Sequence, residues 1–303
     1  MKNEQLSKSA LKKQIINNAI KEYLNTPLYD RSISRVSEKF GINKKTLTKY
    51  LKEKGVEIIS NRNRCNFSES VFDTIDSEEK AYWLGFMYAD GYVLAKKPKF
   101  GLSLSLKDIN HLKKFNDFLK YPKGLNIKET HQFGSKEHVD KNGETLYMVT
   151  TEIQNQHTYD ALVSKGVVPN KSLILTFPDV NVFTSESLVY HFIRGYFDGD
   201  GTLGLYNHSK TNPTLEESLS FVGTKDFLKG VQKYLGEGYL MQKKNCNENT
   251  YRLGYSTKKA FNVAKLMYEN ATIYLDRKYN IYINQFASKN WGKTVKAETP
   301  TPC

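Results

Sequence analysis

Two apolar segments along the chain are each interrupted by small residues and each end in Asp-Gly. The first segment, WLGFMYADG, covers Trp83–Gly91, and the second, IRGYFDGDG, covers Ile193–Gly201, 110 residues later. The apolar runs predict two helices, and residues four positions apart lie on one face of a helix. A signal repeated at this distance predicts two similar domains in one chain.

The small residues and the terminal acids of these two helices predict how the helices would meet. The small residues are Gly85, Ala89, Gly195 and Gly199. Helices that pack through such faces would bring Asp90 and Asp200 together, and adjacent carboxylates repel unless a proton or a cation lies between them. Because hard oxygen ligands suit Mg²⁺, the pattern favours a magnesium site. The simpler alternative is two ordinary helix ends with solvent-exposed aspartates.

The alternation of apolar and polar residues repeats one order of elements after each of these helices. In the first copy we expect strands at 92–94, 100–106, 125–132 and 145–152, with helices at 108–119 and 158–164. In the second copy we expect strands at 202–206, 218–222, 239–243 and 251–255, with helices at 225–235 and 259–269. The αββαββα order predicts an α+β fold in which helices back an antiparallel sheet.

The segment ISRVSEKFGINKKTLTKYLK, Ile33–Lys52, has the spacing of two short helices around a turn. Its apolar positions are Val36, Phe40, Ile42, Leu47 and Tyr50. Gly41 lies in the turn, Asn43 is a plausible N-cap of the second helix, and an earlier helix at about Leu11–Leu24 would complete a three-helix unit. This segment resembles the helix-turn-helix modules of transposases and resolvases, with Ser37 where those usually have alanine.

The second of these helices would present a basic and hydroxylic face. That face consists of Lys44, Lys45, Thr46, Thr48 and Lys49, which are groups suited to phosphates and base edges in a major groove. Residues 1–60 carry 13 basic and six acidic residues, a net charge of +7, whereas the other 243 residues carry +6. The asymmetry favours a separate DNA-binding module at the front, and the alternative is a small helical bundle with a solvated basic face.

The composition favours a folded protein that binds a polyanion. The 303 residues carry a formal net charge of +13, and 13% of them are aromatic, which argues against disorder. The three cysteines, Cys65, Cys246 and Cys303, show no zinc spacing and suggest a reducing compartment. Because there is no membrane-spanning run or signal-peptide core, we expect a cytoplasmic, intracellular protein without a membrane partner, encoded by a bacterium, a phage or an organelle.

The two motifs, their spacing and this element order resemble the LAGLIDADG homing endonucleases of the single-chain, two-motif type. The stretch FDTIDSEEKAYWLGFMYADGYV resembles intron-encoded members, and the resemblance covers about residues 70–288. It implies two pseudo-symmetric domains whose motif helices form the interface. It also implies that their antiparallel sheets form a saddle over double-stranded DNA with a long target site, in a monomer.

The resemblance also implies the residues of the site. The last acid of each motif, Asp90 and Asp200, would bind two or three Mg²⁺ ions, with the backbone carbonyls of Ala89 and Gly199 as further ligands. The family places a lysine after the last helix of each half. The matching residues are Lys171 in GVVPNKS and Lys278 in YLDRK, which would polarise a water or offset transition-state charge. The alternative for both is an ordinary surface lysine.

DNA contacts would come from alternate residues on the strands, because one sheet face packs on helices. In the first half the candidates are Ser103, Ser105, Lys107, Lys128, Thr130 and Gln132, and in the second half they are Ser218, Ser220, Lys243 and Arg252. Since a slip of one residue reverses the faces of a strand, the choice of face is a hypothesis. Tyr88 replaces the first motif acid of many members, a position that is not the metal ligand in the family.

We therefore interpret the chain as a magnesium-dependent endodeoxyribonuclease for intron or free-standing-gene homing. The expected parts are a helix-turn-helix module at 1–60, a linker at 61–75, LAGLIDADG domains at 76–182 and 183–291, and a flexible tail at 292–303. Two alternatives remain. One is a non-cleaving DNA-binding regulator on the same scaffold, in which the acidic pair would be free to change, and the other is a maturase that binds intron RNA through the same basic surface.

Overall fold

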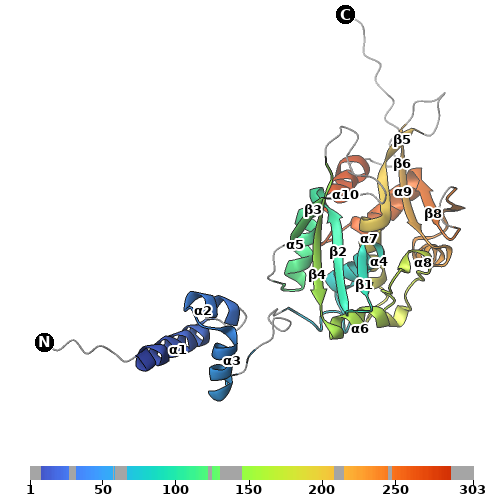
Figure 1. Cartoon of the computed structure of the whole chain (residues 1–303). Coiled ribbons are helices and arrows are strands. Elements are labelled where there is room, and N and C mark those ends of the chain that lie inside the picture. The colour runs from blue at the N-terminus through green and yellow to red at the C-terminus, as the bar shows by residue number, and fades with distance from the viewer. Residues whose placement is uncertain are drawn as a thin grey trace, which may run out of the picture. The chain divides into compact units, whose positions relative to one another are not determined.

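The structure, a computed structural model, describes residues 8–26, 32–56, 58, 67–121, 125–129, 145–207, 215–244 and 248–287. The chain divides into two compact units. The first contains the helices α1 (Lys8–Asn25), α2 (Ile33–Lys39) and α3 (Lys44–Glu53), and the second contains the later elements (Figure 1). None of the described helices combines the length and the apolar character that crossing a bilayer requires.

The three helices of the first unit share a small apolar core. Its buried members are Ile16, Ala19, Ile20, Tyr23, Val36, Leu47 and Leu51. The Asn43 side chain accepts a hydrogen bond from the Lys45 backbone N–H at 2.9 Å, which confirms the predicted N-cap of α3. Tyr50, expected at an apolar position, is 38% exposed, and Leu51 is buried instead, because one residue turns a helix by about 100°.

The second unit contains two halves with the same order of elements. The first half consists of α4 (Glu78–Ala89), β1 (Gly91–Leu94), β2 (Lys99–Ser105), the 3₁₀ turn η3 (Leu106–Asp108), α5 (Ile109–Phe118), β3 (Asn126–Glu129), β4 (Tyr147–Gln154) and α6 (Gln156–Ser164). The 3₁₀ turns η4 (Lys171–Leu173) and η5 (Val180–Val182) follow. The second half consists of α7 (Leu188–Asp200), β5 (Gly201–Asn207), β6 (Leu215–Gly223), α8 (Lys225–Leu235), β7 (Tyr239–Gln242), β8 (Tyr251–Ser256) and α9 (Thr257–Tyr268).

The described strands form two four-stranded antiparallel sheets with equivalent topology, β1-β2-β4-β3 and β5-β6-β8-β7 (Figure 1). The predicted α+β class and the predicted αββαββα order are therefore present in the chain itself. In β2 the buried Leu102 and Leu104 alternate with the half-buried Ser103 and Ser105. This period of two places the apolar face of the strand against the helices and the serines on the other face.

The structure also contains elements that the pattern did not predict. After α9 the chain forms α10 (Asp276–Ile281) and a π-helical segment, Tyr282–Ala287. Both are too short for a helical period to be recognised in the sequence. Asp108 occupies the N-cap position of α5, but its side chain makes no cap hydrogen bond and accepts from Arg277 instead. Phe72 and Ile75, in the segment expected as a linker, are fully buried in the second unit.

Candidate active site

The helices α4 and α7 pack against each other with no side chain between them at two matched positions. A Cβ built on Gly85 would lie 1.9 Å from the Phe192 carbonyl oxygen, and one built on Gly195 would lie 1.9 Å from the Tyr82 carbonyl oxygen. Real Cβ atoms do not approach backbone so closely, so both positions require glycine. The contact is reciprocal, which confirms the predicted packing of the two helices through their small residues.

This packing brings the acidic ends of the two helices together. Asp90 is the C-cap of α4, and Asp200 is the last residue of α7. A Cβ built on Gly199 would lie 2.3 Å from the Ala89 Cβ and 3.2 Å from Asp90 Oδ2. The Asp90 carboxylate therefore lies against the last turn of α7, the turn that carries Asp200.

Burial and repulsion disfavour two charges in this place. Burial and the nearby Asp200 carboxylate raise the pKa of Asp90 to about 6, against the opposing pull of Lys278, Lys171 and Arg277. Burial also raises the pKa of Asp200, an effect that Lys171, Lys278 and the nearby Tyr196 hydroxyl counteract. Without a cation, the first-half acid is therefore the one that more readily takes up a proton.

Both predicted lysines lie beside this carboxylate pair, and each is bound to the backbone of its own half. The Lys171 Nζ donates to the carbonyl oxygen of Gly91, and the Lys278 Nζ donates to that of Gly201 at 2.6 Å. The two acceptors are equivalent, because each glycine directly follows a motif aspartate. Lys278 lies within α10, rather than after the last helix as expected, and is 3% exposed.

The two lysines are not buried to the same degree. Lys278 Nζ also donates to the carbonyl oxygens of Phe197 at 2.5 Å and Gly199 at 3.4 Å. Burial lowers its pKa to about 8, while Asp198, Asp90 and Asp200 oppose that shift. Burial lowers the pKa of the half-buried Lys171 as well, against the pull of Asp200 and Asp90. Neither residue is an ordinary solvated surface lysine.

The residues present fit a hard divalent cation. Two buried carboxylates that repel each other offer the oxygen ligands that Mg²⁺ prefers. A cation bound between them would stabilise their charged forms, which burial disfavours. In the described ranges no group of three or more acidic, histidine or cysteine side chains forms a metal cluster. The donor set is therefore two carboxylates with nearby carbonyls, which leaves ligand positions for water and phosphate.

Sequence reasoning missed a buried polar network behind α7. Asp198, which is fully buried, accepts hydrogen bonds from Tyr82 Oη at 2.8 Å, Tyr268 Oη at 2.5 Å and the Leu275 backbone N–H at 2.7 Å. The only signal in the sequence was Asp198 itself, an acidic residue inside an apolar helix, which was interpreted as part of the motif.

A second buried group in the same helix is Arg194, which is 1% exposed. It donates to Glu78 Oε1 at 2.6 Å and to the carbonyl oxygens of Ile273 and Met267, both at 3.0 Å. The sequence pattern did not predict the burial of Arg194, because a basic residue in an amphipathic helix is usually solvated. Arg194 therefore ties α7 to α4 and to the loop that precedes α10.

The structure places the strand candidates for DNA contact unequally. Ser103 and Ser105 are half-buried on the face away from the helices, and Ser103 Oγ is 2.8 Å from Thr150 Oγ1. Lys107 is exposed but lies in η3, since β2 ends at Ser105. Lys128 is in β3, with a side chain outside the described residues, and Thr130 and Gln132 lie outside them altogether.

In the second half, the serine candidates are covered. Ser218 and Ser220 are 7% and 3% exposed, although they alternate with the apolar Leu219 and Phe221 as expected. The Tyr206 ring lies beside Gly204, the partner of Ser218 across the sheet, where a built Cβ would come within 3.1 Å of it. Lys243 is exposed just after β7, and Arg252 is exposed on β8.

In the first unit, the predicted basic face is open. Lys44, Lys45 and Lys49 are exposed on α3, and Thr46 and Thr48 are half-buried. The Thr48 hydroxyl donates to the Lys44 carbonyl oxygen at 2.7 Å, within the helix. Lys49 is 3.8 Å from Glu53, an exposed pair of little energetic weight.

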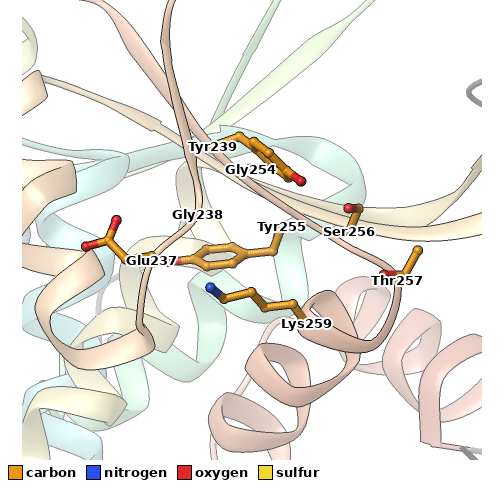
Figure 2. Close-up of a pocket in the computed structure, with 8 residues that line it drawn as sticks. All are labelled: Glu237, Gly238, Tyr239, Gly254, Tyr255, Ser256, Thr257 and Lys259. Atoms are coloured by element: carbon orange, nitrogen blue, oxygen red, sulfur yellow. The ribbon is translucent and has the colours of Figure 1, made fainter.

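Two cavities lie near these features. One of about 220 Å³ adjoins the carboxylate pair and includes Tyr88, Lys171 and Asp200 in its lining. Another of about 360 Å³ lies at the edge of the second sheet, where Lys259 lies beneath the Tyr255 ring (Figure 2). The second cavity contains none of the predicted site residues.

Comparison with known proteins gives similarity in structure and none in sequence. No family model matches the chain, and no curated protein sequence matches it. The I-LtrWI LAGLIDADG homing endonuclease bound to target DNA is 12% identical, with 68% of this chain and 88% of that chain covered and a TM-score of 0.43. The meganuclease I-AabMI bound to uncleaved DNA is 16% identical, with 66% and 86% covered and a TM-score of 0.40. Over about two thirds of its length, the chain is thus similar to solved structures of LAGLIDADG homing endonucleases.

Proposed function

We propose that this chain is a site-specific endonuclease that hydrolyses one phosphodiester on each strand of a DNA duplex with a divalent metal. The observation that carries the proposal is the matched pair of half-sites at the ends of α4 and α7. Each half contributes one carboxylate, Asp90 or Asp200, and one lysine bound to the glycine carbonyl after that carboxylate. Two equivalent sets of groups suit a substrate with two equivalent strands.

Asp90 and Asp200 would hold the metal, with the carbonyls of Ala89 and Gly199 as further ligands. When bound there, two or three Mg²⁺ ions would lower the pKa of a water and offset charge on the phosphate oxygens. Lys171 and Lys278 would act at the same phosphates as cationic donors, because a lysine with a pKa of about 8, as for Lys278, remains mostly protonated at neutral pH. The half-buried setting would exclude bulk water and strengthen each of these interactions.

The sheet faces opposite the helices would form the DNA-binding saddle. Ser103 and Ser105 in the first half and Arg252 and Lys243 in the second are the accessible sequence candidates on or next to these faces. Tyr239, 69% exposed on the same face as Arg252, joins them. Ser218 and Ser220, which are 7% and 3% exposed, would be less accessible to DNA than these candidates.

The first unit would extend the DNA footprint. The exposed lysines of α3 suit phosphate contacts, and a tethered second module raises affinity because its binding becomes intramolecular. We assign the module to 1–60 and the two catalytic halves to 76–182 and 183–291, with the preceding Phe72 and Ile75 packed on the second unit.

The decisive experiment incubates the full chain with a randomised duplex library and Mg²⁺ and sequences the broken ends. We expect discrete double-strand breaks within one long site, and none with Asp200→Asn, which keeps the shape of the side chain but loses the charge. Sites that the protein protects but does not cut would contradict the nuclease function and support the alternative of a non-cleaving DNA-binding regulator. If Asp200→Asn produced as many double-strand breaks as the parent, Asp200 would not be a metal ligand.

A second experiment tests the first unit in the full chain. We expect the triple variant Lys44→Gln, Lys45→Gln, Lys49→Gln to reduce the slope of log affinity against log salt by about 2.7, since each of three phosphate contacts contributes about 0.9. The matched control substitutes Lys229, Lys233 and Lys265, exposed on α8 and α9. An equal loss of slope in both variants would mean that the α3 face makes no dedicated contact.

A further inference from the structure

The position two residues before the terminal aspartate of each motif helix makes a contact that neither the metal nor the DNA requires. This position is Tyr88 in α4 and Asp198 in α7. The residue types are unrelated, since one is a phenol and the other a carboxylate. Each side chain nevertheless contacts the segment of its own half that leads to the lysine of that half.

In the second half the connection is short. Asp198 Oδ2 accepts from the Leu275 backbone N–H at 2.7 Å. The Leu275 carbonyl oxygen in turn accepts from the Lys278 backbone N–H at 3.0 Å, as the first hydrogen bond of α10. One residue therefore joins Asp198 to the backbone of Lys278, and the start of α10 is fixed against α7.

In the first half the connection is longer and its polarity is reversed. The Tyr88 hydroxyl donates to the Lys165 carbonyl oxygen at the end of α6. The next residue, Gly166, has φ +94, and a Cβ built on it would lie 2.0 Å from the Tyr88 hydroxyl oxygen. The tyrosine therefore fills the space above the turn from which the chain continues to Lys171, and Tyr88 and Lys171 line the same cavity of about 220 Å³.

We propose that Tyr88 and Asp198 are positioning residues, each of which fixes the lysine-bearing segment of its own half, Tyr88 for Lys171 and Asp198 for Lys278. A hydroxyl donor meets a carbonyl in one half, and a carboxylate acceptor meets an N–H in the other. The purpose of fixing the lysines rests on the nuclease function proposed above, but the fixing itself is a property of the protein alone. It can therefore be tested without DNA or metal.

The test measures the acylation rate of each lysine with an N-hydroxysuccinimide ester of acetate, read by mass spectrometry on the full chain. Asp198→Ala should raise the rate at Lys278 about tenfold, the effect of losing a hydrogen bond to a charged group, and leave Lys171 unchanged. Tyr88→Phe should raise the rate at Lys171 about threefold, as for a neutral hydrogen bond, and leave Lys278 unchanged.

Two matched variants separate positioning from charge and from general loosening. Asp198→Asn keeps an oxygen that can accept from the Leu275 N–H but removes the charge that opposes the lowered pKa of Lys278. Its Lys278 rate therefore reports the effect of charge alone and should rise clearly less than in Asp198→Ala. Tyr268→Phe removes a different donor to Asp198 and should leave both lysines unchanged. Hydrogen exchange of the peptide containing Leu275 should accelerate in Asp198→Ala only.

The test is decided by which variant changes the acylation rate of which lysine. Thermal unfolding of each variant confirms that it folds. If Asp198→Ala does not fold, Asp198→Leu, an apolar residue of similar shape that also removes the acceptor, takes its place in the Lys278 arm. A rise at both lysines in Tyr88→Phe, or equal rises at Lys278 in Asp198→Asn and Asp198→Ala, would overturn the proposal. Because no DNA is present, absence of cleavage activity would leave this result unaffected.

Discussion

The two halves of the second unit have the same backbone topology but bury different kinds of side chain. Both have the same strand order, the same glycine at the helix contact and the same lysine-to-carbonyl bond. The first half buries an aromatic cluster around Trp83, which lies 5.0 Å from the Phe115 ring. The second buries charges, with Arg194 where the first motif has Leu84.

The comparison separates two kinds of constraint. Features at the contact between the halves, or at the carboxylate pair, are the same in both, because each half must match the other there. The residues two positions before the terminal aspartates, Tyr88 and Asp198, differ because each contacts the lysine-bearing segment of its own half, although Asp198 also accepts from Tyr82 of the first half. The predictions below test this division, in order of decreasing effect.

The largest effect is expected at the shared contact. Gly195→Ala places a Cβ 1.9 Å from the Tyr82 carbonyl oxygen, so α4 and α7 must separate. We expect the free energy of unfolding of the second unit to fall by more than about 4 kcal/mol, even though alanine favours a helix. Denaturant unfolding measures it, with Gly254→Ala as the control, where the nearest atom would be 3.9 Å away. Equal losses would refute the contact.

The next effect tests the buried charge that only the second half has. Arg194→Leu gives the second half the residue of the first, leaves Glu78 without its cation and should cost about 3 kcal/mol. The control Lys265→Gln breaks an exposed pair with Glu269 and should cost less than about 0.5 kcal/mol. The double variant Arg194→Leu, Glu78→Leu should recover part of the loss. A loss for Arg194→Leu no larger than the control would show that Glu78 and the loop do not depend on Arg194.

The carboxylate pair gives a pH-dependent difference. The pKa of Asp90 in the folded protein is about 6, above its ordinary value of 3.8, so the native state binds more protons and loses stability as pH rises from about 4 to 6. In the presence of a chelator, Asp90→Asn should therefore be more stable than the parent at pH 7, on the order of 2 kcal/mol, and equally stable below pH 4.

The comparison between halves sharpens this prediction. Asp200→Asn should give a smaller gain at pH 7, because burial alone raises the pKa of Asp200, whereas burial and the Asp200 charge both raise that of Asp90. Mg²⁺ should raise the unfolding temperature of the parent and of neither variant. A gain for Asp90→Asn that is the same at pH 4 and pH 7 would contradict the assignment of the shift to this carboxyl.

The smallest effect concerns a hydroxyl that only the second half has. The Tyr196 hydroxyl donates to the Val222 carbonyl oxygen at 2.8 Å, and the equivalent residue in the first half is Phe86. Tyr196→Phe should cost about 1 kcal/mol in denaturant unfolding, the typical net value of one hydrogen bond. A loss above about 2 kcal/mol would indicate that the second half depends on this hydroxyl in a way that the first half does not.

Periodicity predicted the repeated elements well because each strand and helix has one apolar face. The predicted helix 225–235 coincides with α8, and the predicted strand 251–255 differs from β8 by one residue. The close approach at Gly85 and Gly195 was also predictable, since small residues four apart have few other uses. Asp90 and Asp200 followed from the same pattern.

The parts that escaped prediction depend on distant partners. Asp198 and Arg194 are stabilised by Leu275, Ile273 and Met267, which are some 70 to 80 residues away in sequence, and no local pattern encodes such bonds. Ser218 is 7% exposed although it lies on the face away from Leu219 and Phe221, and the period of the strand does not determine how much a side chain on that face is covered. The start of α10, and with it the setting of Lys278, depends on Asp198 in the same way.

The contact between Gly85 and Gly195 has one more consequence, because both halves belong to one polypeptide. In a pair of identical subunits, a rotation axis through that contact would force every surface to occur twice. A tandem arrangement keeps the crossing of the helices and removes the axis, so each half can acquire its own contacts. A ligand bound across the crossing need not be palindromic.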